Sequence, residues 1–271
     1  MPVNTNSGLL SEAHVLGIAK RALVFSLLGL ILLIAGSFIA VDWMIFFFGI
    51  HTIYASAAKP VTSFICLLLV LLIGADGIDR RDTALLAIAF VCIVPVDILM
   101  SVVALSPGLT VASPAFMVGG VLSIVAHLLL IVRHGRGFPY FRSAFRRENG
   151  LEGAWTFVGL PLLAYGACAA ALVPLLQLMI TVGHAVVGLI YSACVATSVW
   201  IAWETVRFKL YPKPNAWLIG IAMTCWFITE IIGEIYNVQI GPISKVLFNF
   251  VWVFYGTTIV CLALSGYRWS R

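Results

Sequence analysis

The sequence predicts an all-α, polytopic integral membrane protein, and three observations support this class. Hydrophobic residues make up 62% of the 271 positions, only 10% are charged, and the mean hydropathy is +1.09. These values lie outside the range of soluble globular domains. Eight long apolar segments follow one another along the chain, and most of the basic residues lie in the gaps between them. That placement indicates membrane topology signals and argues against a nucleic-acid-binding face.

The eight apolar segments approach the length of membrane-spanning helices, which need roughly 20 apolar residues to cross the hydrocarbon core. In chain order they run from Ala22 to Val41, Pro60 to Gly74, Thr83 to Leu105, Pro114 to Val132, Ala154 to Pro174, Leu178 to Ala202, Ala216 to Ile235 and Val246 to Tyr267. The apolar stretch from Trp43 to Ile50 is too short to cross, and we interpret it as re-entrant or interfacial. We therefore predict one membrane domain over residues 1–271, with a polar cytoplasmic stretch at 1–20.

The distribution of Lys and Arg predicts the orientation, because cytoplasmic loops are enriched in both. With eight spans, Lys59 and Lys245 lie on one side of the membrane. The other side holds Lys20, Arg21, Arg80, Arg81, Arg133, Arg136, Arg142, Arg146, Arg147, Arg207, Lys209, Lys213, Arg268 and Arg271. One missed span would reverse every later loop, so a split of 14 against 2 favours eight spans. We predict both termini in the cytoplasm and expect the cell inner membrane as the host.

A weak internal repeat appears when the chain is shifted by 133 residues. Ala89, Cys92, Asp97 and Ile98 then align with Ala222, Cys225, Glu230 and Ile231. The halves would be residues 21–135 and 153–268, with four spans each, and an even number makes such repeats parallel. Chance similarity between apolar segments is the alternative interpretation.

Two acidic residues lie inside predicted spans, where ionisable side chains are costly and are usually functional. Asp97 lies 14 residues after Thr83, and Glu230 lies 14 residues after Ala216. At 1.5 Å per residue, both are about 21 Å from the cytoplasmic start of their helices, so we expect them at one depth. Two neighbouring carboxyls leave one as an acid and the other as a carboxylate, which suits hydrolysis of an acid-labile bond. Alternatively, each carboxyl only bonds a polar neighbour and fixes helix packing.

Three further residues are candidates for the same site. Lys59, at the outer start of the second span, pairs with a carboxylate or a lipid phosphate, or else acts only as a snorkelling anchor. His127 is six residues before Arg133, so we expect it close to the cytoplasmic surface and far from the acids. Tyr255 offers a hydrogen-bond donor in an apolar interior, although core packing alone also explains it.

The chain lacks the short motifs of several other chemistries. It contains no HExxH zinc spacing, no Walker loop and no GxSxG elbow. We therefore expect no metal and no cofactor.

Several short elements are shared with one membrane family. They are Lys59-Pro60, Phe90 with Asp97, Phe116 with Gly119 and His127, Phe227 with Glu230, and Phe254-Tyr255. In these elements, spread over residues 22–265, the chain resembles the YhhN-like lysoplasmalogenase family. Members of that family have eight spans and hydrolyse the vinyl ether bond of lysoplasmalogens.

The resemblance implies acid catalysis on a lipid substrate within the bilayer, without a cofactor. Asp97 and Glu230 would be catalytic, and Lys59, His127 and Tyr255 would bind substrate. The chain departs from the family pattern, because Glu230 replaces an aspartate, Val96 a glycine, Leu130 an aromatic residue and Thr258 an amide. These departures indicate a divergent member, and a non-catalytic relative is an alternative.

Other classes of function fit the same residues. Two membrane carboxylates in parallel repeats would also serve a proton-coupled small-molecule or lipid transporter, and Pro95 offers a helix break near Asp97. A retinal-binding photoreceptor needs a lysine in mid-helix, whereas Lys245 begins the last span. A purely structural membrane protein is the remaining alternative.

Overall fold

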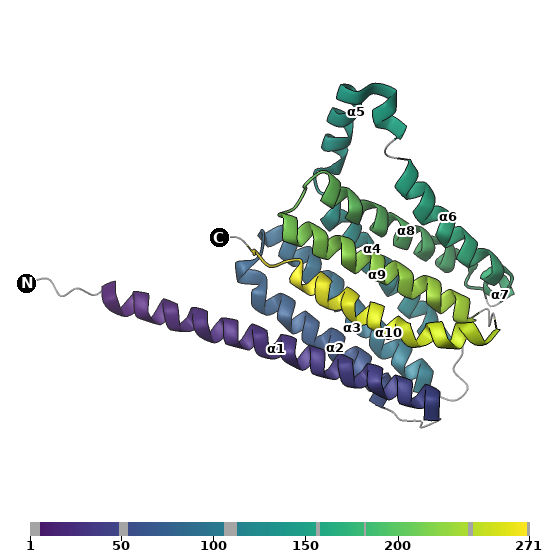
Figure 1. The fold of residues 1–271 in the computed structure, drawn as a ribbon, viewed down its shortest axis with the longest axis horizontal. Coiled ribbons are helices and arrows are strands. Elements are labelled where there is room, and N and C mark those ends of the chain that lie inside the picture. Colours follow the sequence, from purple (N-terminus) through teal and green to yellow (C-terminus); the bar gives the residue numbers. More distant parts are fainter. Residues whose placement is uncertain are drawn as a thin grey trace, which may run out of the picture.

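The protein is a bundle of long helices, shown in Figure 1 as a computed structural model. The structure describes residues 6–48, 54–105, 113–155, 158–181, 183–237 and 241–269. The helices are α1 (Asn6–Phe48), α2 (Tyr54–Ile73), η1 (Gly74–Asp76), α3 (Arg80–Leu105), α4 (Pro114–His134), α5 (Phe138–Trp155), α6 (Gly159–Leu172), η2 (Val173–Leu175), α7 (Leu176–Thr181), α8 (Ala185–Arg207), α9 (Lys213–Asn237) and α10 (Gly241–Leu264). Within these ranges there is no strand, and one isolated bridge pairs Gly77 with Tyr267. The prediction of an all-α protein is confirmed.

Five of the described helices are long and apolar enough to span a membrane. Their spanning parts are Lys20–Val41, Arg80–Ser101, Pro114–His134, Ala185–Arg207 and Lys213–Gly233. Three shorter apolar helices cover Ala57–Ile73, Gly159–Leu175 and Phe250–Leu264. Length and composition thus support an integral membrane protein with several spans.

Some predicted boundaries are wrong. The stretch from Trp43, interpreted as re-entrant or interfacial, is not a separate element and continues α1 as far as Phe48. The fifth predicted span begins at Gly159 rather than Ala154, because residues 138–155 form the separate helix α5. The sixth begins at Ala185, because α7 ends at Thr181 and Gly183, with φ +77°, breaks the helix before α8. Apolar composition alone does not reveal such breaks, since it is similar on both sides of each one.

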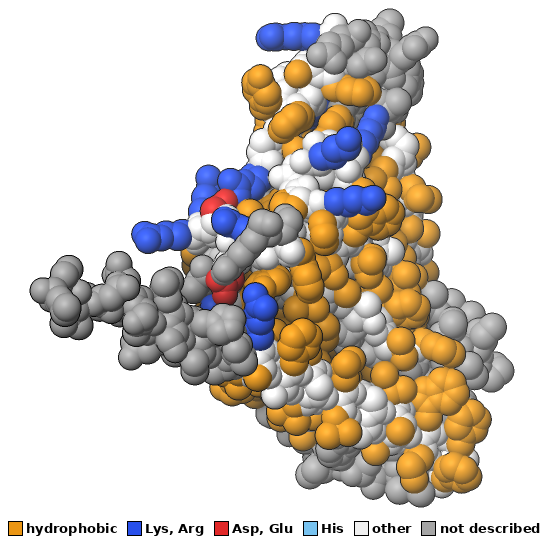
Figure 2. Space-filling model, turned by 60° about the vertical axis from the view of Figure 1, so that its left-hand side comes forward, with side chains coloured by type: hydrophobic (Ala, Val, Ile, Leu, Met, Phe, Trp, Pro, Cys, Tyr) orange, Lys and Arg blue, Asp and Glu red, His pale blue; other side chains and the backbone are white. Residues whose placement is uncertain are grey.

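The bundle is held by neighbouring helices that pack in pairs. α3 lies between α2 and α4, α9 lies between α8 and α10, and α4 packs on α8. The core contains fully buried side chains from several helices: Leu69, Phe90, Leu130, Ile219, Met223 and Leu262. Large apolar side chains also cover much of the outside, as Figure 2 shows, and lipid is the solvent that suits such a surface.

Charged side chains gather at one end of the bundle. Figure 2 shows blue and red side chains at the end where Figure 1 places the C-terminus, while orange covers most of the remaining described surface of that view. We call this the basic end. From it α5 leaves the bundle and runs across the direction of the other helices (Figure 1), after a turn at Gly137 whose φ of +77° favours glycine.

Candidate functional site

Asp97 is the centre of a buried polar cluster formed by three helices. Its Oδ2 accepts hydrogen bonds from Ser63 Oγ on α2 and from Tyr255 Oη on α10, the latter at 2.5 Å. Its Oδ1 lies 3.1 Å from Lys59 Nζ, also on α2. We call Lys59, Ser63, Asp97 and Tyr255 the acid site. Every oxygen of this carboxylate has a donor, and one donor is a cation.

Lys59 is held by aromatic rings as well as by the carboxylate. Its Nζ lies 4.5 Å from the ring centre of Tyr255 and 5.4 Å from that of Trp252. Ring faces attract cations, which offsets part of the cost of moving an ammonium group out of water. The Lys59 side chain keeps 18% of its surface exposed, whereas that of Asp97 keeps 1%. The lysine is therefore the member of the acid site that a ligand from outside can reach.

The second predicted acid, Glu230, lies on α9 in a different setting. Its Oε1 accepts a hydrogen bond from Trp226 Nε1 at 3.1 Å. It lines a cavity of about 20 Å³ together with Cys168 and Leu172 of α6 and Tyr191 of α8. A volume of this size holds about one water molecule. Among the described residues, Glu230 has no cation within ion-pair distance, in contrast to Asp97.

His127, predicted to lie far from the acids, contacts the same tryptophan that bonds Glu230. Its ring is packed against Trp226, with centroids 4.4 Å apart, and Trp226 is the residue that donates to Glu230. Tyr191, which lines the cavity, lies edge-on to the histidine at 5.5 Å. His127 is fully buried, so its side chain faces the interior of the bundle. The spacing to Arg133 predicts its depth on α4 but not the side chains that surround it.

His127 also has an unusual pattern of hydrogen bonds. Its Nδ1 lies 2.9 Å from Ser198 Oγ on α8, while its Nε2 is buried without a hydrogen-bond partner. A neutral ring with one bonded nitrogen suits this apolar setting. The aromatic side chains around it make His127 a support for the Glu230 region, and nothing places it beside Lys59.

The two acids have separate hydrogen-bond partners. Asp97 is bonded to groups on α2 and α10. Glu230 is bonded to Trp226 of its own helix and to Tyr191 of α8, and no hydrogen bond joins the two carboxyls. The arrangement is thus two carboxyls with separate donors, and only Asp97 is paired with Lys59, rather than two carboxyls sharing a proton.

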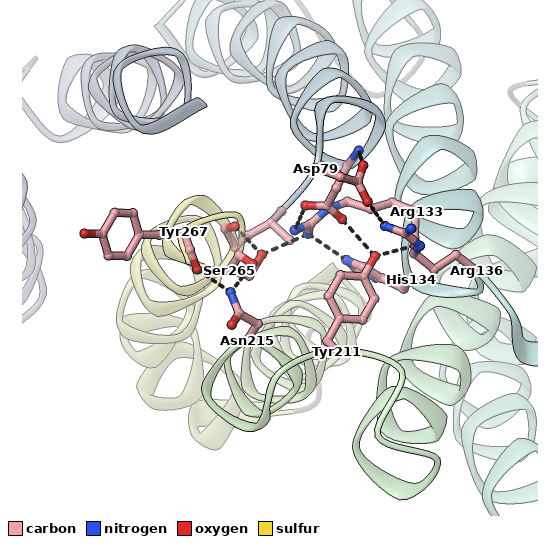
Figure 3. A network of polar contacts seen from close by, with 10 residues as sticks. Asp79, Arg133, His134, Arg136, Tyr211, Asn215, Ser265 and Tyr267 are labelled. Atoms are coloured by element: carbon pink, nitrogen blue, oxygen red, sulfur yellow. Dashed lines mark hydrogen bonds and ion pairs between the residues drawn. The ribbon is translucent and has the colours of Figure 1, made fainter. Parts of the chain in front are cut away.

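A second buried polar cluster, at the basic end, was not predicted from the sequence (Figure 3). Arg133 of α4 donates to Asp82 of α3 through Nε at 2.9 Å and through Nη2 at 2.8 Å. Its Nη1 donates to Ser265 Oγ at 2.8 Å and approaches His134 Nε2 at 3.2 Å. Both charged side chains are fully buried. We call Asp82, Arg133, His134, Tyr211 and Ser265 the end cluster.

Tyr211 closes the end cluster from the loop between α8 and α9. Its hydroxyl lies 2.8 Å from Asp82 Oδ1 and 2.6 Å from the carbonyl of Arg133. Burial raises the pKa of Tyr211, so its hydroxyl keeps the proton that it donates. Nearby, Asn215 Nδ2 donates to the carbonyls of Ser265 and Tyr267 at 2.8 and 2.6 Å, which ties α9 to the end of α10 (Figure 3). No sequence signal joins Asp82 to Arg133, since charges at helix ends are expected in any case.

The chain has no match among protein families, curated proteins or solved structures. Its function therefore has to be argued from the site itself. The acid site offers a carboxylate held by two hydroxyls and an ammonium group, and the Glu230 region offers a second carboxyl beside a water-sized cavity. Together they provide a base, an acid and a cation inside an apolar bundle, which suits acid–base chemistry or proton movement.

Proposed function

We propose that the protein is a membrane-embedded hydrolase of the vinyl ether bond of lysoplasmalogen-type lipids. The observation that carries the proposal is the acid site: Lys59, Asp97 and Tyr255 come from three positions far apart in the sequence and make direct contact. Glu230 supplies the second carboxyl. The family resemblance of the same residues supports this choice of bond.

The surroundings of the two acids assign their roles in this proposal. Asp97 faces an ammonium group and two hydroxyls, so it is the carboxylate. The donors to Glu230 are neutral, the indole of Trp226 and the hydroxyl of Tyr191, so Glu230 carries the proton and is the general acid. Lys59, the accessible cation, binds the phosphate of the lipid headgroup.

The reaction then runs in three steps. Glu230 donates its proton to the alkene carbon farther from the ether oxygen, which leaves an oxocarbenium ion that the Asp97 carboxylate stabilises. Water adds to the carbon next to the oxygen and gives up a proton to Asp97. The resulting hemiacetal breaks into a fatty aldehyde and the alcohol of the lysolipid headgroup, and the proton returns to Glu230. One water molecule is consumed.

The proposal includes the arrangement in the membrane. We propose eight spans, because five long and three shorter apolar helices among the described residues add up to the number that the charge split favours. The basic end then faces the cytoplasm of the host, together with both termini. The four-span repeats remain part of the proposal, although Asp97 and Glu230 have unlike partners.

The test is release of long-chain aldehyde from a lysoplasmalogen by the purified full chain in detergent. We expect the wild type to be active and Asp97→Asn and Glu230→Gln each to lose roughly 100-fold or more, the usual effect of removing an acid or base. The control is Glu204→Gln, which changes a buried carboxyl of α8 at the basic end. Wild type without aldehyde release across pH and headgroups contradicts the proposal.

A proton-coupled small-molecule or lipid carrier is the second candidate, favoured by one observation. The cavity at Glu230 is only about 20 Å³, which admits water but not a lipid chain. In this case Glu230 would take up and release a proton while Lys59 and Asp97 remain paired. Proton movement into vesicles that contain the protein, abolished by Glu230→Gln and unaffected by lysoplasmalogen, favours the carrier over the hydrolase.

A further inference from the structure

One face of helix α5 is covered by aromatic packing against the end of α8. Phe138, Phe141 and Phe145 lie at helical spacing, and their rings contact Phe208 at centroid distances of 6.2, 6.4 and 5.8 Å. Phe138 also meets Trp200 edge-on at 5.7 Å. These contacts fix the direction in which α5 leaves the bundle and the face that it turns inward.

The opposite face of α5 combines an aromatic ring with a positive charge. Tyr140 is 73% exposed, and Arg147, seven residues later and therefore on the same face, is also exposed. Arg142 is exposed as well, but it lies four residues after Phe138 and therefore on the side of the helix nearer to α8, where its charge acts on Glu204. An exposed aromatic on a helix with exposed arginines is the side-chain pattern of a helix lying in a membrane interface.

The position of α5 agrees with that pattern. Figure 1 shows it crossing the direction of the spanning helices, between α4 and α6. The apolar surface resumes directly after it, since Leu162 and Leu163 of α6 are 70% and 71% exposed. Helix α5 therefore lies at the boundary between the charged basic end and the lipid-facing surface.

We propose that α5 is an anionic-phospholipid binding helix, which holds the phosphates of the leaflet at the basic end with Arg142 and Arg147. Guanidinium groups bind phosphate through paired donors, and the Tyr140 ring lies at headgroup level with its hydroxyl in water. An acidic protein or a nucleic acid fits this face less well, because neither explains an exposed tyrosine on a helix that is followed directly by the lipid-exposed α6.

The test compares hydrogen exchange of residues 138–155 in the full chain between two bilayers. One nanodisc contains only phosphatidylcholine, and the other contains added phosphatidylglycerol. Each arginine near an anionic surface contributes roughly a fivefold gain in binding, so we expect clearly slower exchange of α5 in the anionic disc. The double variant Arg142→Gln with Arg147→Gln should exchange equally in both discs.

The matched control removes two other exposed charges at the basic end, in Arg80→Gln with Arg81→Gln. These arginines begin α3, so their loss should leave the slowing at α5 in place. Equal exchange of the wild type in both discs overturns the proposal. The proposal is also overturned if the control variant loses the slower exchange of α5 as fully as the α5 variant does. In that case the slower exchange would depend on the total positive charge of the basic end and not on α5.

Discussion

The acid site and the end cluster both bury a carboxylate with a cation, but they are built differently. In the end cluster, Arg133 forms a two-pronged contact with Asp82, and both side chains are fully buried. In the acid site, Lys59 makes one contact with Asp97 at 3.1 Å and stays partly exposed. A guanidinium fixes the geometry of its partner, whereas an ammonium group is a point charge that changes partners readily.

This difference separates a structural ion pair from a reactive one. Arg133 of α4 donates to Asp82 of α3 and to Ser265 at the end of α10, so the cluster fixes these three elements together. The acid site lies about 22 Å further along α3, counting 15 residues from Asp82 to Asp97. There the carboxylate is held by groups that a substrate or water can replace.

The largest expected effect is the loss of Arg133. In Arg133→Met, Asp82 keeps its charge in a buried place without a cation, which costs about 3 to 5 kcal/mol of folding free energy. Thermal unfolding in detergent, followed by tryptophan fluorescence, measures this. The control Arg136→Gln removes an arginine from the exposed pair with Asp79 and should change stability by less than about 1 kcal/mol. Similar stability of the two variants would contradict a structural role for the end cluster.

The matching change in the acid site should have a smaller effect on stability. In Lys59→Met, Asp97 keeps the hydroxyls of Ser63 and Tyr255, and water can reach the site, so we expect a loss of about 1 to 3 kcal/mol. Lys59→Arg is the control, because it keeps the charge. A loss as large as that of Arg133→Met, measured by the same unfolding, would show that the two pairs are equally structural.

The acid site and the end cluster were not equally predictable from the sequence. Asp97 and Glu230 stand out because charges are rare inside apolar spans. Lys59, at the start of a span, was expected to pair with a carboxylate or a lipid phosphate, or to be only a snorkelling anchor. Ser63 was missed, since a serine in an apolar run is common and nothing shows that it faces an acid on another helix. Asp82 was missed for the opposite reason, because an acid at a helix start is ordinary.

The fold was predictable in its class and in most of its helices, but less so in its breaks. Long apolar runs identify spanning helices because this signal does not depend on how the helices pack against one another. The separate helix α5 and the break at Gly183 depend on local backbone geometry and on aromatic contacts with α8. His127 shows the same limit, since its depth on α4 followed from spacing while its contact with Trp226 depends on how α4 and α9 pack.

Two tyrosines sharpen the comparison, because each donates a hydroxyl to one of the buried carboxylates. Tyr211→Phe removes a donor from Asp82 and should lower the unfolding free energy by about 0.5 to 1.5 kcal/mol without changing activity. Tyr255→Phe removes a donor from Asp97 and should lower aldehyde release by roughly tenfold. This rate loss corresponds to an increase in activation free energy of about the size of one hydrogen bond. Unfolding and activity are measured for both variants. If Tyr211→Phe lost activity and Tyr255→Phe lost only stability, the end cluster would be the reactive region and the acid site the structural one.

The smallest expected effect concerns Asp79, at the exposed edge of the end cluster. Its carboxylate accepts the backbone N–H of Asp82 at 2.7 Å and pairs with Arg136, and both contacts lower the pKa of Asp79. Because the folded pKa is lower than the unfolded value of about 3.9, the stabilisation is complete above that pH and disappears as the pH falls through the folded pKa. Asp79→Asn keeps a helix-capping side chain without the charge.

At pH 7, Asp79→Asn should therefore be less stable than wild type by about 0.5 kcal/mol, the usual size for an exposed pair. The difference should shrink as the pH falls below about 4 and as salt is added, because both remove the attraction to Arg136. Unfolding temperatures of the two proteins at pH 7 and pH 3 measure it. A difference that neither low pH nor added salt reduces would contradict a role of the Asp79 charge.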